Sequence, residues 1–340
     1  MKLSKTARMT SLALCTAVLS SLATQGHADE NSTTLSTVLD RGYLICGVGV
    51  ADIGFAAQQV NGNWAGFDVD FCRAVAAATL GDAQAVEFVP LDSLNRLRAL
   101  KDGDVDVLFR TTTYTMDRDV ALGFEFPAIT YYDSQRVLAH ASTNAKRLAD
   151  LDGFTICANA GTTSIANIRK AIEANDVDVD ILEISSQAGR WRAFFGQECD
   201  AVTSDYSDLS AMVAAQGLDE RTFVILDDEI ANEPLSSVVL EGDQQWEQII
   251  RWVVNLLVLS EAEGVGKDSG ATVISQLSIP APTALGLSDG WASQIISQVG
   301  NYGDIFARNL GDDSALGIKR GLNNLWRDGG LMYPLPMSTD

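Results

Sequence analysis

Residues 104–126, DVDVLFRTTTYTMDRDVALGFEF, form the stretch around which the chain is organised. An apolar run rich in β-branched residues, 105–109, gives way to four hydroxyl side chains and then to Arg118. The hydroxyls belong to Thr111, Thr112, Thr113 and Thr115. This pattern is typical of a buried strand that ends in a polar loop. Because open α/β sheets bind ligands at the carboxyl ends of their strands, we expect a small molecule to be held here.

Arg118 has two interpretations. Its rigid fork of donors fits a carboxylate, and threonine hydroxyls can bond the same oxygens. Alternatively, it forms a surface ion pair with Asp117, Asp119 or Glu125, and the sequence alone leaves this choice open.

The first 28 residues have the pattern of a secretory signal. Lys2, Lys5 and Arg8 precede a short apolar run, 9–23, and small residues lead to Ala28. We therefore predict a signal peptide over residues 1–28, cleaved near Ala28, and an exported mature chain. The apolar run is too short to span a bilayer.

The composition excludes some partners. Without the signal the chain keeps 21 basic against 45 acidic residues, a formal charge of about −24. A field of this sign argues against nucleic acid and anionic membranes. Roughly 310 mature residues exceed a single core, so we expect two lobes.

The mature chain carries four cysteines, Cys46, Cys72, Cys157 and Cys199. An even set in an exported protein suggests disulfides, with three possible pairings. Their division between the two halves favours Cys46–Cys72 and Cys157–Cys199. A zinc site is the alternative, but no C-x-x-C pair supports it, and we expect neither metal nor cofactor.

Few residues suit catalysis. His140 is the one histidine left after cleavage, and no G-x-S-x-G or H-E-x-x-H motif accompanies it. A structural histidine is the favoured interpretation, and we do not expect an enzyme.

Alternating patterns predict two α/β layers. The first layer has strands at 43–50, 85–89 and 104–109 and helices at 69–80, capped by Asp68, and 92–101. The second has strands at 154–158, 179–184, 200–203 and 222–227 and helices starting at 162, 187 and 205. Two extended stretches, 131–140 and 234–240, predict a two-strand hinge between the layers. Beyond residue 243 helices are expected at 243–263, which we assign to core packing, 289–299, 302–310 and 318–328.

Two places in the second layer can bind charged groups. Residues 160–164, AGTTS, precede a helix and offer backbone N–H groups, hydroxyls and the positive end of a dipole. Asp205 follows a strand and can pair with a cation. Each place also has a plainer interpretation, which is helix capping. Together with Arg118, Thr111 and Thr113 they would satisfy both charges of an α-amino acid.

Several segments resemble the polar amino-acid solute-binding proteins of ABC importers, family 3, and in particular their general L-amino-acid-binding periplasmic subgroup. The segments are 66–73 (GFDVDFCR), 104–118, 160–163 (AGTT), 199–205 (CDAVTSD), 233–235 (EPL), 242–246 (GDQQW) and 321–326 (GLNNLW). The resemblance implies an α/β, two-lobed periplasmic-binding-protein fold (type II, Venus flytrap) with two hinge strands and a helical C-terminal extension. Lobe 1 would comprise 29–134 and 236–340, and lobe 2 would comprise 135–235.

The resemblance also implies roles for the ligand site. Arg118 would hold the ligand carboxylate with Thr113 and the amide of Thr162 or Thr163, and Asp205 would bind the α-ammonium. Thr111 would share the ammonium, and Phe55 would form an apolar wall. Ser93 and Asn159 depart from the pattern of glutamine binders, where an aromatic ring and a lysine stand, and this fits a broad specificity.

The implied function is delivery of L-amino acids, of broad specificity, to ABC permease subunits in the inner membrane by a monomeric periplasmic receptor. The alternative is an exported enzyme on the same scaffold, such as a dehydratase acting on a carboxylic acid, with Asp205 or Glu125 as acid and base.

Overall fold

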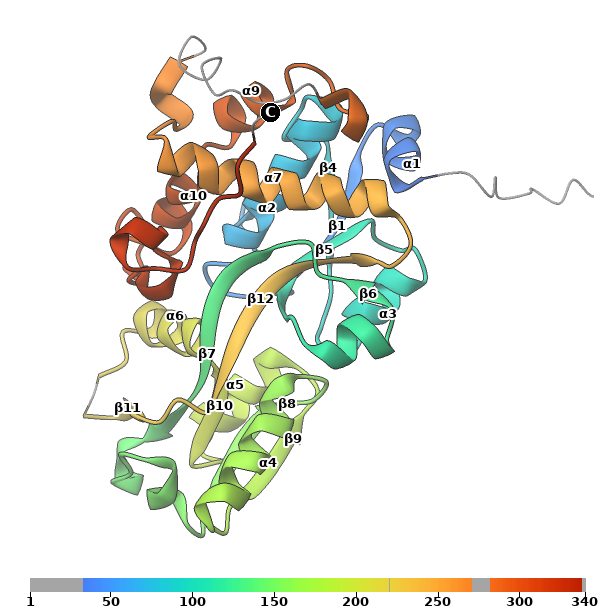
Figure 1. Ribbon diagram of the computed structural model, residues 1–340. Coiled ribbons are helices and arrows are strands. Elements are labelled where there is room, and N and C mark those ends of the chain that lie inside the picture. Colours follow the sequence, from blue (N-terminus) through green and yellow to red (C-terminus); the bar gives the residue numbers. More distant parts are fainter. Residues whose placement is uncertain (1–32, 220, 271–281, 338–340) are drawn as a thin grey trace, which may run out of the picture. The chain divides into compact units, whose positions relative to one another are not determined.

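A sheet of ten strands forms the frame of the described chain (Figure 1). The computed structural model describes residues 33–219, 221–270 and 282–337. The strands of the sheet are β1 Leu44–Val48, β4 Val86–Pro90, β5 Val107–Thr113, β6 Phe124–Glu125, β7 Ile129–His140, β8 Thr155–Asn159, β9 Asp180–Ile184, β10 Ala201–Asp205, β11 Phe223–Ile225 and β12 Ala231–Leu240. The main path has the order β4-β1-β5-β12-β7-β10-β8-β9, while β6 pairs with β12 and β11 with β7. A separate short ladder joins β2 Ala57–Gln58 to β3 Trp64–Ala65.

Two long antiparallel strands, β7 and β12, connect the two halves of this sheet. In Figure 1 they run side by side from the upper group of helices to the lower one. β12 pairs with β5 in lobe 1, and β7 pairs with β10 in lobe 2. The chain therefore leaves lobe 1 through β7 and returns through β12, as the two extended stretches predict.

Lobe 1 places helices on both faces of β4, β1 and β5. Its helices are α1 Thr34–Arg41, α2 Phe67–Leu80, α3 Arg96–Lys101, α7 Gln244–Ala262, α9 Trp291–Gln298 and α10 Tyr302–Asn309. Aromatic side chains pack together in its core, where the ring of Phe67 lies edge-on to the rings of Phe71 and Tyr302. Trp246 of α7 is buried, and its indole N–H donates to the carbonyl of Asp106 at 2.9 Å. The apolar face of α7 thus packs in the core, as the sequence predicts.

Lobe 2 is a smaller layer of the same kind. Its helices are α4 Thr163–Asn175, α5 Gln187–Phe195 and α6 Tyr206–Gln216. Ile168 of α4 is buried in an apolar cluster with Ile156 and Ala201. Phe194 of α5 and Leu209 of α6 are buried in a second cluster. The two clusters show that both faces of this half-sheet are covered, as in other parallel sheets.

Four local predictions were wrong. Gly66, and not Asp68, is the N-cap of α2, because the Asp68 carboxylate instead accepts a bond of 3.1 Å from the backbone N–H of Thr111. α3 starts at Arg96 and not at residue 92, since the Asp92 carboxylate accepts bonds from the next backbone N–H groups and forms a turn. Thr111, Thr112 and Thr113 extend β5, where the partner strand β12 continues the ladder. Residues 318–328 form only the short 3₁₀ turns η6 Gly321–Asn323 and η7 Trp326–Asp328.

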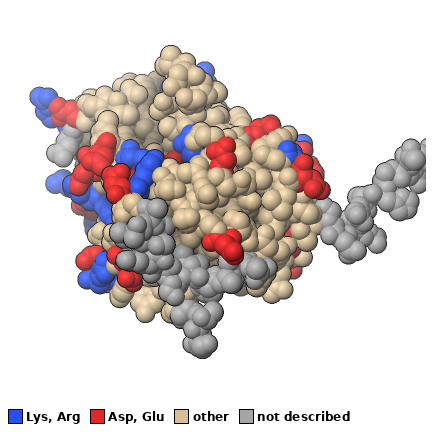
Figure 2. Space-filling view, turned by 90° about the horizontal axis from the view of Figure 1, so that it is seen from above, with Lys and Arg blue, Asp and Glu red and all other residues tan. Residues whose placement is uncertain are grey.

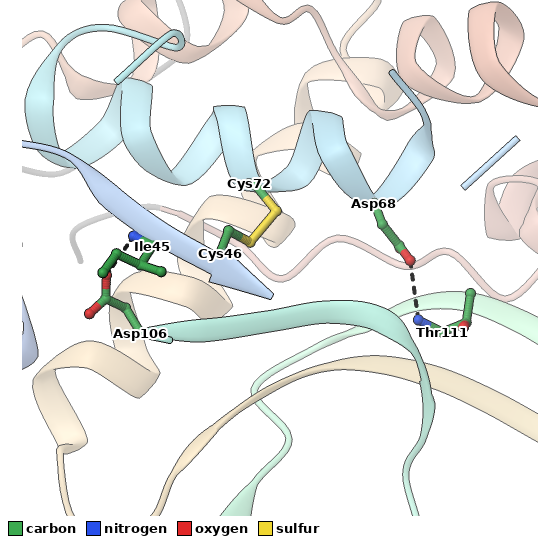
Figure 3. The surroundings of a disulfide bond; sticks show 6 residues. All are labelled: Ile45, Cys46, Asp68, Cys72, Asp106 and Thr111. Atoms are coloured by element: carbon green, nitrogen blue, oxygen red, sulfur yellow. Dashed lines mark hydrogen bonds between the residues drawn. A yellow bond between two sulfur atoms is a disulfide. The ribbon is translucent and has the colours of Figure 1, made fainter. Parts of the chain in front are cut away.

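Both lobes carry a disulfide. Cys46 of β1 is bonded to Cys72 of α2, and this joins a helix to the strand beneath it (Figure 3). Cys157 of β8 is bonded to Cys199, just before β10. The structure thus contains the pairing that the sequence favours.

The signal peptide predicted over residues 1–28 lies outside the described residues. In the described ranges, no helix has the length and apolar character needed to cross a bilayer. No cluster of potential metal ligands occurs in the same ranges. Figure 2 shows one face, on which acidic and basic side chains are interspersed and much of the surface is uncharged. The acidic side chains that are visible there therefore do not form one continuous patch.

Candidate functional site

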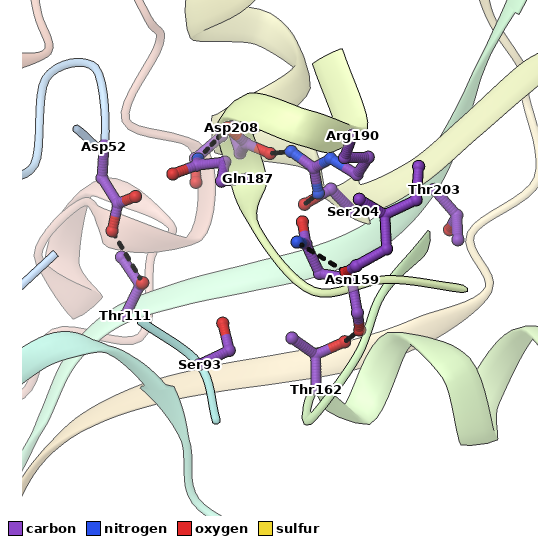
Figure 4. A network of polar contacts seen from close by, with 12 residues as sticks. Asp52, Ser93, Thr111, Asn159, Thr162, Gln187, Arg190, Thr203, Ser204 and Asp208 are labelled. Carbon is purple, nitrogen blue, oxygen red and sulfur yellow. Dashed lines mark hydrogen bonds and ion pairs between the residues drawn. The ribbon is translucent and has the colours of Figure 1, made fainter. Parts of the chain in front are cut away.

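A cavity of about 60 Å³ lies between the two lobes. Lobe 1 contributes Asp52, Ile53, Phe55, Ser93, Arg96, Arg110, Thr111 and Thr113 to its wall. Lobe 2 contributes Asn159, Thr162, Thr163, Ser164, Gln187, Arg190, Ser204, Asp205, Ser207 and Asp208. Figure 4 shows many of these polar side chains arranged around a common space. Charged and hydroxyl groups dominate the wall, so the cavity suits a small ligand with more than one polar group.

The lobes touch directly beside the cavity. The Thr113 and Thr163 hydroxyls lie 3.3 Å apart, and a guanidinium nitrogen of Arg96 lies 3.5 Å from the carbonyl oxygen of Gly161. Gly161 has a φ of +74°, and a Cβ there would come within 2.7 Å of Leu94 of lobe 1. Such contacts describe a closed arrangement of the two lobes.

The structure brings most of the predicted site residues together. Thr111, Thr113, Thr162, Thr163, Asp205 and Phe55 all line the cavity. Arg118 does not belong to this lining. It is buried in η1 (Asp117–Ala121), and its Nη1 donates to the carbonyl of Thr113 at 2.7 Å. It makes no ion pair with the nearby Asp117, Asp119 or Glu125 in the described residues.

Two of the predicted site residues donate their hydroxyl groups to a carboxylate on the hinge strand β12. Thr113 donates to Glu233 of β12 at 2.5 Å, and Thr163 donates to the same carboxylate at 3.0 Å. Asn167 of α4 also donates to it at 2.8 Å. Glu233 is fully buried and thus ties a strand of lobe 1 to a helix of lobe 2 through β12. The sequence suggested no role for this residue.

Asp205 is the last residue of β10 and precedes α6. Asp205 occupies the N-cap position of α6, as the plainer interpretation expects, but its side chain makes no capping bond to that helix. In the described residues it also has no ion pair. Burial, together with the nearby Asp133 and Glu233, raises the pKa of Asp205 well above its usual range. A cationic group of a ligand would remove this penalty.

The predicted helix N-terminus is also in place. Thr162 is the N-cap of α4 but makes no side-chain capping bond, and its hydroxyl instead donates to the carbonyl of Asn159 at 2.6 Å. On the other side of the cavity, Phe55 is buried edge-on against Phe67 and Tyr131, which fixes its ring as a rigid wall.

Two arginines of lobe 1 were missed. Arg110 lies within β5 and lines the cavity, and it donates to the carbonyl of Leu91 at 3.0 Å and to the Ser93 hydroxyl at 3.2 Å. Arg96 begins α3, is 2% exposed and donates to the carbonyl of Ser93 at 2.5 Å. A charged residue directly after the apolar run of a predicted strand was a signal that could have identified Arg110.

A polar network in lobe 2 was missed as well. Arg190 of α5 pairs with Asp208 of α6 and donates to the Ser204 hydroxyl at 2.7 Å (Figure 4). Gln187 donates to Asp208 at 3.0 Å. Asp52 is buried opposite them and accepts a bond of 3.5 Å from the Thr111 hydroxyl. The spacing of these residues in the sequence does not predict the network, because the contacts depend on how three separate elements pack together.

A two-lobed α/β fold with a polar cavity between its lobes is typical of solute-binding proteins. Residues 44–257 match the family of bacterial extracellular solute-binding proteins, family 3. The match covers more than half of the chain, and the protein belongs to this family.

Curated relatives share this class. The chain is 38% identical to the general L-amino acid-binding periplasmic protein AapJ of Rhizobium johnstonii, over 95% of this chain and 98% of AapJ. It is also 38% identical to the glutamate/glutamine/aspartate/asparagine-binding protein BztA of Rhodobacter capsulatus, over 90% of this chain and 94% of BztA. These relatives are solute-binding proteins, and nothing in them supports the alternative of a dehydratase.

A solved structure agrees with the fold. The periplasmic binding protein of an ABC transporter from Brucella ovis, with glutathione bound, superposes with a TM-score of 0.84 at 38% identity. The superposition covers 90% of this chain and all of that protein. A cysteine-binding protein from Campylobacter jejuni, at 22% identity and a TM-score of 0.61, supports the fold alone.

Proposed function

We propose that this protein is a periplasmic receptor that binds L-amino acids between its lobes and presents the closed complex to the permease subunits of an ABC importer. AapJ and BztA, named as amino-acid-binding proteins, support this class of ligand. The Brucella ovis relative extends it to glutathione, a peptide that itself carries an α-amino acid end.

The observation that carries the proposal is the Asp205 carboxylate. It lines the cavity without a capping bond and, in the described residues, without an ion pair. A carboxylate in this state favours a cationic partner, and an α-ammonium group supplies one with several N–H donors.

The other end of the ligand is assigned to lobe 1 and to the start of α4. Arg118 would turn from the Thr113 carbonyl toward the ligand carboxylate, and the N–H group of Thr162 or Thr163 would complete the contact. Thr111 shares the ammonium, and the Phe55 ring covers the apolar part of the ligand.

Further parts of the proposal concern the whole chain. Lobe 1 comprises residues 29–134 and 236–340, and lobe 2 comprises 135–235. The signal peptide is removed near Ala28, the mature protein acts as a monomer in the periplasm, and it catalyses no reaction on its ligand.

Calorimetric titration of the mature protein tests the proposal. The ligands are the twenty L-amino acids and glutathione, with sugars as negative controls. We expect several amino acids to bind with a Kd in the micromolar range or below. A micromolar Kd corresponds to a binding free energy of about −8 kcal/mol. The variant Asp205→Asn should weaken binding of each of them at least about 30-fold, since a charged hydrogen bond contributes roughly 2 kcal/mol.

The matched control is Glu173→Gln, which removes one negative charge from an exposed position on α4 of the same lobe. It should bind as the wild type does. Binding of sugars alone, or unchanged affinity in Asp205→Asn, would contradict the proposal.

A further inference from the structure

The lobe 1 side of the cavity contains more positive charge than one α-carboxylate requires. Arg96 and Arg110 line the cavity, and Arg118 lies beside it. In the described residues, none of these three guanidinium groups forms an ion pair with a carboxylate. A single ligand carboxylate at Arg118 would therefore leave two buried cations without a counter-ion.

Arg96 is the least compensated of the three. Its side chain is 2% exposed, and its Nε has no hydrogen-bond partner. Its partners are two backbone carbonyls, that of Ser93 at 2.5 Å and that of Gly161 at 3.5 Å. Carbonyl oxygens orient a guanidinium group but do not neutralise it, so the charge remains available to an anion.

The carboxyl groups near these arginines do not fill this role. Asp52 and Asp68 are acidic neighbours of Arg110, yet both accept hydrogen bonds from Thr111, whose backbone N–H donates to Asp68 at 3.1 Å and whose hydroxyl donates to Asp52 at 3.5 Å. Asp208 is already paired with Arg190. In the described residues, none of these carboxylates is therefore an ion-pair partner of Arg96 or Arg110.

We propose that Arg96, flanked by Arg110, binds a second carboxylate at the side-chain end of the ligand, so that the receptor prefers dicarboxylic amino acids to neutral ones. This inference rests on the proposed function, because it assumes that the α-carboxylate and α-ammonium are bound by Arg118 and Asp205. The ligand class is the one represented by L-glutamate and L-aspartate, whose second carboxylate can accept both donors of a guanidinium fork.

The isosteric pairs glutamate and glutamine, and aspartate and asparagine, test the inference by calorimetry on the wild-type protein. We expect each acid to bind about tenfold or more tightly than its amide, because the amide leaves buried charge unpaired. Equal affinities within each pair, or tighter binding of the amides, would overturn the inference and leave the proposed function standing. Failure of all four ligands, and of every other amino acid, would overturn both.

The variant Arg96→Gln locates the effect. It should lower the affinity for glutamate at least about tenfold more than the affinity for glutamine. An equal loss for both ligands would overturn the inference, since it would place Arg96 at the α-carboxylate or in a structural role. Arg98→Gln is the matched control, because Arg98 lies on the same helix with its side chain 78% exposed. This control should keep the wild-type ratio.

Loss of a buried side chain can unfold a lobe, so melting curves accompany each titration. Arg96→Lys is the second variant, which keeps the charge but not the fork. Its ratio of glutamate to glutamine affinity should lie between those of the wild type and Arg96→Gln. A ratio in Arg96→Lys below that of Arg96→Gln would contradict the inference.

Discussion

At the scale of single residues, the site is built from carboxyl groups that the fold buries at a cost. Burial is the largest cause of a raised pKa for each member of this group, namely Asp52, Asp68, Asp133, Asp205 and Glu233. Residues of this kind lower stability when they ionise, and proteins keep them where a ligand or a neighbouring element needs them. Asp52 and Asp205 line the cavity, so a cationic group of a ligand can offset part of this cost.

Asp68 makes this cost measurable. Its pKa is about 7 in the folded chain, against 3.8 as the ordinary value. Because the folded state holds a proton that the unfolded state has lost, stability should fall as the pH rises from about 4 to about 7. Asp68→Asn removes this penalty and should raise the free energy of unfolding at pH 8 by up to about 4 kcal/mol, at roughly 1.4 kcal/mol per pKa unit. Urea unfolding at several pH values measures the effect.

The control for this prediction is two residues away on α2. Asp70 pairs with Arg73 and Arg308, so Asp70→Asn should lower stability at pH 8. Burial also raises the pKa of Asp133, so this residue should preserve part of the pH dependence in Asp68→Asn. If Asp68→Asn were less stable than the wild type at pH 8, this would contradict the proposed cost of ionising the buried Asp68 carboxyl group.

At the scale of elements, the sequence predicted the alternation of strands and helices because apolar runs and terminal signals are local. α5 begins at residue 187, as predicted, and Gly81 ends α2 in a left-handed conformation. The end of β5 was missed, since it depends on pairing with β12, more than 100 residues away. Arg96 and Arg190 were missed for the same reason, because their positions at the cavity depend on tertiary packing.

The loop before α4 should control closure. A Cβ at Gly161 would lie 2.7 Å from the Leu94 side chain and 3.2 Å from the carbonyl oxygen of Ser93. Gly161→Ala should therefore hinder the contact between the lobes and weaken amino-acid binding about tenfold or more, as titration calorimetry would measure. The left-handed φ of +74° adds about 1 kcal/mol of strain in either state.

Gly153→Ala is the control for that strain. Gly153 belongs to the same lobe and has a φ of +77°, but open space surrounds it. Both variants should lose similar stability, while the weaker binding should be confined to Gly161→Ala. Equal affinity in the two variants would show that the loop does not limit closure.

At the scale of the whole molecule, a ligand between the lobes should favour the closed arrangement. Small-angle scattering of the wild type should show a smaller radius of gyration with a bound amino acid than without it. The melting temperature should also rise by about 4 °C at a ligand concentration of 100 times Kd, for a chain of this size. An unchanged radius combined with a raised melting temperature would indicate binding without closure.

The path of the chain through β7 and β12 also determines when each lobe can complete its core. Lobe 2 is one continuous stretch between these strands, so all of its elements are available once β12 has emerged. Lobe 1 begins first but is finished last, because its core requires α7, α9 and α10 from the C-terminal part. During synthesis, the second lobe can thus fold while the first still exposes the apolar surface of α2. A chaperone that prevents aggregation of this protein would therefore bind mainly to the N-terminal third of the chain.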